Sequence, residues 1–232
     1  MRVAIIPARG GSKRIPRKNI KMFCGKPMIA WSIEVALQSG CFDLVVVSTD
    51  DDEIASVARE QGASVPFMRP PELADDYTGT IPVISHAIKQ LDAQGLGVKQ
   101  ACCIYATAPF LRGEDLRCGL QLLEENNCSY AFSVTSYGFP IQRAVRITSG
   151  GRVEMFSPEH FNTRSQDLEE AYHDAGQFYW GQASAWLSGQ VIFTPESSPV
   201  LLPRHRVQDI DTPDDWARAE WMFKAMVAEA RG

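Results

Sequence analysis

The residues with the clearest chemical potential follow the first short apolar segment of the chain. The loop 7–14 contains two adjacent glycines, and further basic residues come directly after it. Glycine lets a backbone approach a ligand and turn N–H groups toward it, arginine grips phosphate oxygens in a forked geometry, and lysine adds a point charge. The pattern predicts a site for a triphosphate-sized anion, and a solvated basic loop is the alternative that it leaves open. The candidate residues are Ala8, Arg9, Gly10, Gly11, Ser12, Lys18 and Asn19.

A pair of carboxylates lies near the other end of the chain. Residues two apart in an extended segment face the same way, so Asp209 and Asp211 share a face while Ile210 points to the core. Such carboxylates repel each other unless a cation lies between them, and oxygen ligands of this kind suit Mg²⁺ together with substrate phosphates. We therefore expect a Mg²⁺ site here. The alternative is that both charges only stabilise the N-terminus of the next helix, which is the role we expect for Asp214 and Asp215.

Three further segments place polar or aromatic side chains next to predicted elements. The loop 69–80 begins with Arg69 and two prolines, and Thr80 at its end is expected to cap the following helix. Tyr105 and Thr107 follow a predicted buried strand, so both should line a cleft at its end. In the aromatic run 172–180, His173 could orient a sugar, although a lone histidine is more often structural and aromatic residues more often pack in a core.

The elements around these segments must position them, and the first two-thirds of the chain alternates strand-like and helix-like patterns. Apolar strands that alternate with helices are typical of a mainly parallel sheet covered on both faces. The loops after the strands should then meet at the carboxyl edge of the sheet, where such sheets bind ligands. A last helix starts with a capping box made by Thr212 and Asp215, with Pro213 at its first position. The predicted strands are 2–7, 44–48 and 101–105, and the predicted helices are 27–38, 51–61, 80–93 and 114–126.

One segment departs from this alternation. Residues 139–172 are richer in turns and polar residues, with a predicted hairpin between 143–147 and 152–155. We interpret the segment as a small dimerisation or substrate arm, inserted in a single domain that covers residues 1–232. The main fold is expected to resume at 177–180.

Composition and charge exclude several classes of protein. The chain has 232 residues and a net charge of −5, which is ordinary for a globular protein and argues against a general nucleic-acid binder. Residues 1–33 carry several basic side chains and no acidic one, as expected if a small polyanion binds at one place. The six cysteines form no disulfide framework or zinc pattern, and no segment reads as a membrane span or a signal peptide. We therefore expect a cytoplasmic protein with neither nucleic acid nor membrane as a partner.

Taken in order, these motifs resemble the acylneuraminate cytidylyltransferases, the CMP-sialic acid synthetases, over nearly the whole chain. The motifs are those at 5–13, 18–19, 69–74, 107–109 and 209–212. The resemblance implies a doubly wound α/β fold of the nucleotide-diphospho-sugar transferase type, and a homodimer with an exchanged arm. It also implies CTP as a substrate and Mg²⁺ as the cofactor, held by Asp209 and Asp211, with Arg9 and Lys18 joining these aspartates in catalysis. The nucleotide positions that it implies are Arg9, Lys18, Asn19, Arg69 and Thr80, beside the glycine loop.

The sugar side departs from the sialic acid enzymes. Tyr105 stands where they have a glutamine, Gln142 where they tend to have a carboxylate-binding lysine, and His173 near an expected arginine. The segments that look instead like the pseudaminic acid branch are 139–143, 162–169 and 172–180. We therefore expect transfer of CMP from CTP to the anomeric hydroxyl of pseudaminic acid, a nine-carbon acidic sugar, with Arg143 or Arg164 taking over the sugar carboxylate. The expected sugar-binding residues are Tyr105, Thr107, Gln142, Arg143, Arg164, His173, Gln177 and Tyr179.

Three alternatives stay open on the sequence. The same reaction could act on sialic, legionaminic or another 2-keto sugar acid. A nucleotidyltransferase could instead join UTP or GTP to a sugar phosphate. A non-catalytic nucleotide-binding or nucleic-acid-binding module is the remaining alternative, supported only by the basic residues 1–33, and it leaves the paired carboxylates unexplained.

Overall fold

A six-stranded sheet forms the centre of the protein, whose computed structural model describes residues 1–229. The strand order is β10-β6-β9-β5-β1-β4, and β9 alone among these strands runs antiparallel to its neighbours. The prediction of a mainly parallel sheet is therefore confirmed. The strands are β1 (Arg2–Pro7), β4 (Leu44–Ser48), β5 (Gln100–Ile104), β6 (Tyr130–Ser136), β9 (Tyr172–Gln182) and β10 (Ser197–Leu201).

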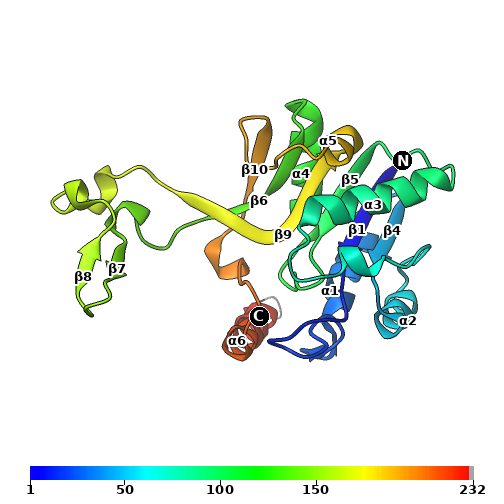
Figure 1. The fold of residues 1–232 in the computed structure, drawn as a ribbon, viewed down its shortest axis with the longest axis horizontal. Coiled ribbons are helices and arrows are strands. Elements are labelled where there is room, and N and C mark those ends of the chain that lie inside the picture. The colour runs from blue at the N-terminus through cyan, green and yellow to red at the C-terminus, as the bar shows by residue number, and fades with distance from the viewer. Residues whose placement is uncertain (230–232) are drawn as a thin grey trace.

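Helices cover both faces of this sheet (Figure 1). One face packs against α1 (Met28–Gln38), α2 (Asp52–Glu60) and α4 (Gly113–Glu125), and the other against α3 (Thr80–Ala93) and α5 (Ala183–Ser188). Strand β1 shows why its sequence is apolar throughout, because Ala4 and Ile6 enter the first core while Val3 and Ile5 enter the second. A strand buried on both sides has no position for a polar side chain, which explains the apolar runs in the sequence.

The last helix, α6 (Pro213–Glu229), packs outside these layers on a third apolar cluster around Phe23. Phe23 lies in a short hairpin formed by β2 (Met22–Phe23) and β3 (Lys26–Pro27), and its ring meets Trp216 edge to face at 5.4 Å. The predicted capping box is confirmed, since Thr212 N–H donates to Asp215 at 2.8 Å and Asp215 N–H donates to the Thr212 hydroxyl at 3.2 Å. The segment before α6 is thereby held against the residues that follow β1.

The arm projects away from the body of the molecule between β6 and β9 (Figure 1). The predicted hairpin forms as β7 (Val145–Ile147) paired with β8 (Val153–Met155). Many apolar side chains of the arm face solvent, and Phe139 at the base of the arm is 87% exposed. The arm also holds three single-turn 3-10 helices, which are Ile141–Arg143, Pro158–His160 and Ser165–Asp167.

Two local predictions differ from the structure. Thr80 does not cap α3, because the helix begins at Thr80 itself and Gly79 occupies the capping position without a side-chain bond. The main fold resumes five residues earlier than predicted, since β9 begins at Tyr172 rather than at residue 177. The residues before 177, among them Asp174 and Gly176, lie in a strand that contains an irregularity.

A buried ion pair connects α4 with the turn that leads to the paired aspartates. This 3-10 turn, Arg204–Arg206, follows β10, and the Arg206 guanidinium donates twice to Asp115, at 2.7 and 2.9 Å. Both side chains are only 7% exposed. Asp115 also accepts the backbone N–H of Arg112 at the start of α4. The pair therefore fixes the path of the chain just before residue 209.

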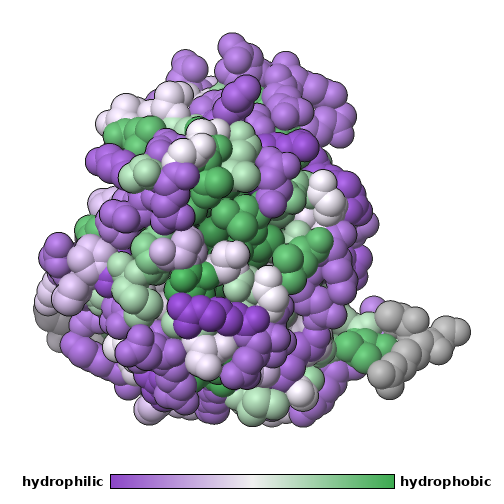
Figure 2. Space-filling view, turned by 90° about the vertical axis from the view of Figure 1, so that its right-hand side faces the viewer, coloured by the Kyte–Doolittle hydropathy of each residue, from purple (hydrophilic) through white to green (hydrophobic). Residues whose placement is uncertain are grey.

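The face that carries α2 and the edge strand β4 is largely hydrophilic, with an apolar area near its middle (Figure 2). Among residues 1–229, none of the helices combines the length and the apolar character that crossing a lipid bilayer demands.

We expect Arg206→Ala to lower the free energy of unfolding by about 3–5 kcal/mol, because the buried carboxylate of Asp115 loses its cation. The matched control is Lys224→Ala, whose pair with Glu220 lies on the surface, and the expected change there is below about 1 kcal/mol. Denaturant unfolding of both variants measures the difference. Equal losses in the two variants would show that the Arg206 pair does not hold the chain in place.

Candidate active site

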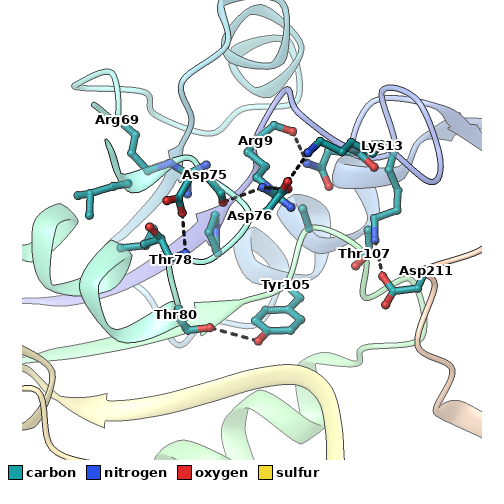
Figure 3. Close-up of a pocket in the computed structure, with 18 of the residues that line it drawn as sticks. Arg9, Lys13, Arg69, Asp75, Asp76, Thr78, Thr80, Tyr105, Thr107 and Asp211 are labelled. Carbon is teal, nitrogen blue, oxygen red and sulfur yellow. Dashed lines mark hydrogen bonds and ion pairs between the residues drawn. The ribbon is translucent and has the colours of Figure 1, made fainter. Parts of the chain in front are cut away.

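A cleft of about 620 Å³ opens at the carboxyl edge of the sheet (Figure 3). It is lined by the loop after β1, the loop 69–80, the start of α3 and the residues after β5, and Asp211 enters it from the other end of the chain. The predicted residues that line it are Arg9, Ser12, Lys18, Asn19, Arg69, Thr80, Tyr105, Thr107 and Asp211. Segments more than 190 residues apart in sequence therefore share one cavity.

The cations at one side of the cleft are already paired with an acidic loop. Arg9 lies 2.6 Å and Lys13 2.5 Å from the carboxylate of Asp76, and Arg9 also donates to the carbonyl oxygen of Asp75 at 2.7 Å. Lys13, followed by Arg9, holds the pKa of Asp76 below its ordinary value. The carboxylate of Asp76 thus lies beside the two cations, where a phosphate group would need to bind (Figure 3).

The basic loop and the twin-aspartate segment meet directly. Lys18 donates to the carbonyl oxygen of Ile210 at 2.7 Å and to the Asp211 carboxylate at 3.2 Å, and Arg14 contacts the same carboxylate at 2.7 Å. The side chain of Lys18 is mostly buried, whereas that of Arg14 is exposed. Lys18 is therefore the fixed partner of Asp211, and Arg14 covers it from the solvent side.

The two aspartates differ in their surroundings. Asp211 lines the cleft, whereas Asp209 is exposed and lies outside the set of lining residues. Desolvation still raises the pKa of the Asp209 carboxyl group, and the like charge of Asp211 is the second cause. Within residues 1–229 no group of three or more histidine, cysteine, aspartate or glutamate side chains gathers in metal-binding geometry. Two oxygen donors beside a phosphate-sized space fit Mg²⁺, which takes one or two carboxylates and completes its shell with water and substrate.

Of the two glycines in the loop, only Gly10 is required by the packing around it. A Cβ atom on Gly10 would lie 2.5 Å from Oδ2 of Asp51, so only glycine fits there, while a Cβ on Gly11 would meet open space. Asp51 accepts the N–H of Ile54 at the start of α2 and two hydrogen bonds from Arg17, which has the left-handed φ of 56°. The Arg17 bond lowers the pKa of Asp51 to about 2. The loop therefore rests on a carboxylate from the end of β4.

Arg69 is the most deeply buried cation at the cleft, with an exposed fraction of 5%. Its Nε and one terminal nitrogen have no hydrogen-bond partner among the described residues, and its only nearby counter-charge is Asp50, at 3.6 Å. Burial lowers the pKa of Arg69, although the group stays charged. A buried guanidinium with unpartnered donors in the wall of a cavity is unusual, because buried polar groups are nearly always hydrogen-bonded.

A second cavity, of about 300 Å³, adjoins the cleft and shares Gly79, Thr80 and Tyr105 with it. The hydroxyl groups of Thr80 and Tyr105 lie 3.2 Å apart and form the boundary between the two spaces (Figure 3). Burial raises the pKa of the Tyr105 hydroxyl. The second cavity is otherwise lined by Ile81, Pro82, Asp174, Tyr179, Ile192 and Phe193.

Several predicted residues lie away from both cavities. Gln142 donates to the carbonyl of Glu169, Arg143 to Ser165 and Arg164 to Asp167, all within the arm. His173 packs against Tyr137 at the base of the arm, and Ala8 is buried in the core. Gln177 contradicts its prediction most directly, because it is buried and donates to the carbonyl of Arg206 at 2.6 Å. The irregular pairing of β9 with β6 begins at Gln177's neighbours, so its orientation does not follow simple strand alternation.

Sequence reasoning missed several residues that line the two cavities. Lys13, Arg14, Asp75 and Asp76 were visible as parts of charged loops, but nothing in their spacing shows that opposite charges would meet. Ile192 and Phe193 lie in a loop with no motif at all. Their position depends on tertiary packing, which a single sequence does not encode locally.

Comparison with known proteins identifies the family of this chain. The cytidylyltransferase family profile matches residues 3–212. A pseudaminic acid cytidylyltransferase of Campylobacter jejuni is 48% identical over 222 residues, which is 96% of each chain. The CMP-N,N'-diacetyllegionaminic acid synthase of Legionella pneumophila is 34% identical over 229 residues, again covering 96% of each chain.

The fold has relatives among solved structures as well. A CMP:2-keto-3-deoxy-manno-octonic acid synthetase in complex with CTP superimposes with a TM-score of 0.72 over 97% of this chain and 99% of that chain, at 17% identity. This likeness concerns the fold alone. Because the family profile and the relatives both span nearly the whole sequence, the chain belongs to the cytidylyltransferase family of nucleotidyltransferases.

Proposed function

We propose that the enzyme transfers CMP from CTP to the anomeric hydroxyl of pseudaminic acid and releases pyrophosphate. The observation that carries the proposal is the meeting of the cationic loop and Asp211 across one cleft that has room for a nucleotide. The 48% identity to the pseudaminic acid cytidylyltransferase of Campylobacter jejuni supports this choice of sugar. The free cysteines, four of them buried, suit the reducing cytoplasm in which we place the enzyme.

In this proposal the triphosphate binds between the glycine loop and the aspartates. Arg9, Ser12 and Lys18 line the space where phosphate oxygens would lie. Asn19 keeps the loop in shape, since its side chain donates to the carbonyl of Arg9 at 3.1 Å. Charge-assisted bonds of this kind position the α-phosphorus and stabilise the charge that develops on its oxygens.

Arg69 and Thr80 are proposed to hold the rest of the nucleotide. Arg69 brings two unused buried donors, and the satisfaction of such donors by ligand oxygens favours binding. Thr80 begins α3 with a free helix N-terminus beside it, because Gly79 supplies no capping side chain. Both residues lie on the side of the cleft opposite Asp211 (Figure 3).

Asp209 and Asp211 are proposed to hold Mg²⁺, which would neutralise phosphate charge and polarise the reacting oxygen when bound. The chain's own contribution is to hold the Asp211 carboxylate facing the cleft, through its contact with Lys18. The sugar hydroxyl oxygen attacks the α-phosphorus in line and releases its proton to water, while the bond to the bridging oxygen breaks and pyrophosphate leaves with that electron pair. Positioning and charge stabilisation supply most of the rate enhancement.

The second cavity is the proposed sugar subsite, with Tyr105, Thr107 and Tyr179 near it. We also propose that the arm joins two copies of the chain into a homodimer, because its apolar side chains are otherwise exposed. In such a dimer Arg143 and Arg164 of the arm would approach the partner's cleft and provide the cations for the sugar carboxylate. This arrangement would account for their distance from the cleft of their own chain.

A substrate panel tests the proposal. Incubation with CTP, Mg²⁺ and separate nonulosonic acids is expected to yield a CMP conjugate and pyrophosphate most rapidly with pseudaminic acid, and mass spectrometry identifies the conjugate. UTP and GTP serve as nucleotide controls and are expected to support no turnover. Faster transfer to legionaminic or sialic acid would replace the proposed sugar, and absence of pyrophosphate with every sugar would exclude the reaction.

Asp211→Ala is expected to lower kcat by about 100-fold or more, because the cleft loses the only one of the paired carboxylates that lines it. The fold should persist, since Asp211 is partly exposed. Asp214→Ala is the matched control, an exposed aspartate three residues away in the first turn of α6. Steady-state kinetics and circular dichroism of both variants give the comparison. Near-normal turnover in Asp211→Ala would remove this residue from the mechanism.

Asp76→Asn is expected to lower the KM for CTP by roughly two- to fivefold at low ionic strength, since CTP no longer competes with a carboxylate for Arg9 and Lys13. The difference should shrink as salt is added, because these charges are exposed. Glu125→Gln on α4 removes an exposed charge elsewhere and should leave the KM unchanged. A higher KM in Asp76→Asn would mean that Asp76 assists binding rather than opposing it.

A further inference from the structure

Asp174 is the only charged residue among the described residues that line the second cavity. It comes from β9, and the cavity around it is mostly apolar, with Ile81, Pro82, Ile192 and Phe193 in its walls. A carboxylate in such surroundings is costly unless it is hydrogen-bonded. Its partners therefore show what the position is built for.

Both oxygens of Asp174 have a donor. Oδ1 accepts the backbone N–H of Gly176 at 2.8 Å, and Oδ2 accepts a short hydrogen bond from the hydroxyl of Tyr179. Gly176 has the left-handed φ of 62°, a conformation that glycine adopts at little cost. The carboxylate therefore holds a turn of the strand on one side and a buried tyrosine on the other.

The pairing of β9 with β6 explains how these residues come together. Asp174 pairs with Val134 and Tyr179 with Phe132, so four residues of β9 lie opposite the single residue Ser133. Residues five apart in a regular strand face opposite ways, whereas the extra residues here bring Asp174 and Tyr179 to one face. The Ser133 hydroxyl accepts the N–H groups of two of the extra residues, at 3.3 and 3.2 Å. Side-chain oxygens thus accept the N–H groups of Gly176, Gln177 and Phe178 and hold the irregular part of the strand in place.

Tyr179, which is held by Asp174, packs against the residues that form the boundary between the two cavities. Its ring is buried and lies nearly parallel to that of Phe132, with the ring centroids 5.9 Å apart. The centroid of the Tyr105 ring lies 5.4 Å from that of Tyr179. Tyr105 in turn meets Thr80, and these two residues separate the nucleotide cleft from the second cavity. Burial raises the pKa of Tyr179 far above its ordinary value, so the hydroxyl remains a donor to Asp174.

We propose that Asp174 is a positioning residue for the sugar: through Tyr179 it fixes the Tyr105 boundary and thereby the shape of the sugar subsite. The inference rests on the proposed function, because it assumes that the sugar enters the second cavity. Asp174 acts through Tyr179, so removal of either group has the same consequence. The nucleotide cleft keeps its other walls, and CTP binding is unaffected.

Kinetics with CTP and the acidic sugar that the unaltered enzyme accepts provide the test. Asp174→Ala and Tyr179→Phe are each expected to raise the KM for the sugar by about tenfold or more, with the KM for CTP within about twofold. The double variant is expected to lose no more than either single variant, because both belong to one interaction. Asp174→Asn keeps one acceptor and is expected to fall between the unaltered enzyme and Asp174→Ala.

Tyr172→Phe is the matched control, since it removes an exposed hydroxyl from the same strand, one that donates to Glu170. Its sugar KM should not change. Equal effects of Asp174→Ala on both substrates would overturn the inference and indicate a merely structural role. A raised sugar KM in Asp174→Ala without one in Tyr179→Phe would also overturn it, because Asp174 would then act directly.

Tyr179→Phe removes a single hydroxyl and remains informative if Asp174→Ala does not fold. Failure of the proposed function has a different signature, because the unaltered enzyme would then form no CMP conjugate with any acidic sugar. Failure of this inference would instead leave transfer intact and the sugar KM unchanged in the variants.

Discussion

Opposite charges from the two ends of the chain meet across the cleft, and the rest of the site depends on this meeting. Lys18 contacts the backbone of residue 210 and the carboxylate of Asp211, although nearly the whole chain lies between them. Like charges repel within each of the two segments, because the loop after β1 gathers cations and the segment 209–211 gathers carboxylates. The sheet positions the first half at the end of β1, and the capping box of α6 with the Arg206–Asp115 pair positions the second.

A second layer of charge lies behind the loop and gives it its shape. Asp51 accepts hydrogen bonds from Arg17 and fills the space that a side chain on Gly10 would need. Asp50 is the nearest counter-charge of Arg69. In front of the loop, Asp76 satisfies the cations that face the cleft. Arg9, Lys13, Arg14 and Lys18 are therefore already paired with carboxylates, so a nucleotide that binds them must replace existing contacts.

Much of the fold could be predicted because its signals are local. The apolar strands 2–7 and 44–48 and the helix between them appear with nearly the predicted bounds, and the capping box of α6 forms as predicted. The direction of the parallel strands predicted that the loops after residues 2–7, 44–48 and 101–105 meet at one sheet edge. The place of the aspartates at the nucleotide site was expected only from the family resemblance.

The remainder of the site depends on tertiary contacts with no local signature. Thr80 is of a residue type that often caps helices, but it is the first residue of α3 and its hydroxyl lies 3.2 Å from that of Tyr105. Gly10 was expected to make room for a ligand and makes room for Asp51. The four-against-one pairing opposite Ser133 shifts the parity of β9, so the inward and outward positions of Gln177 and Asp174 could not be assigned by alternation.

The continuity of β9 has an evolutionary consequence. Its first residues pair with the end of β6 at the base of the arm, and its last residues pair with β5 in the middle of the sheet. An insertion or deletion within this strand would change the reach of the arm and the lining of the second cavity in a single event. Lineages that alter the length of the arm are therefore expected to do so at the hairpin tip, residues 148–151. Residues added there leave the pairing register of β9 unchanged.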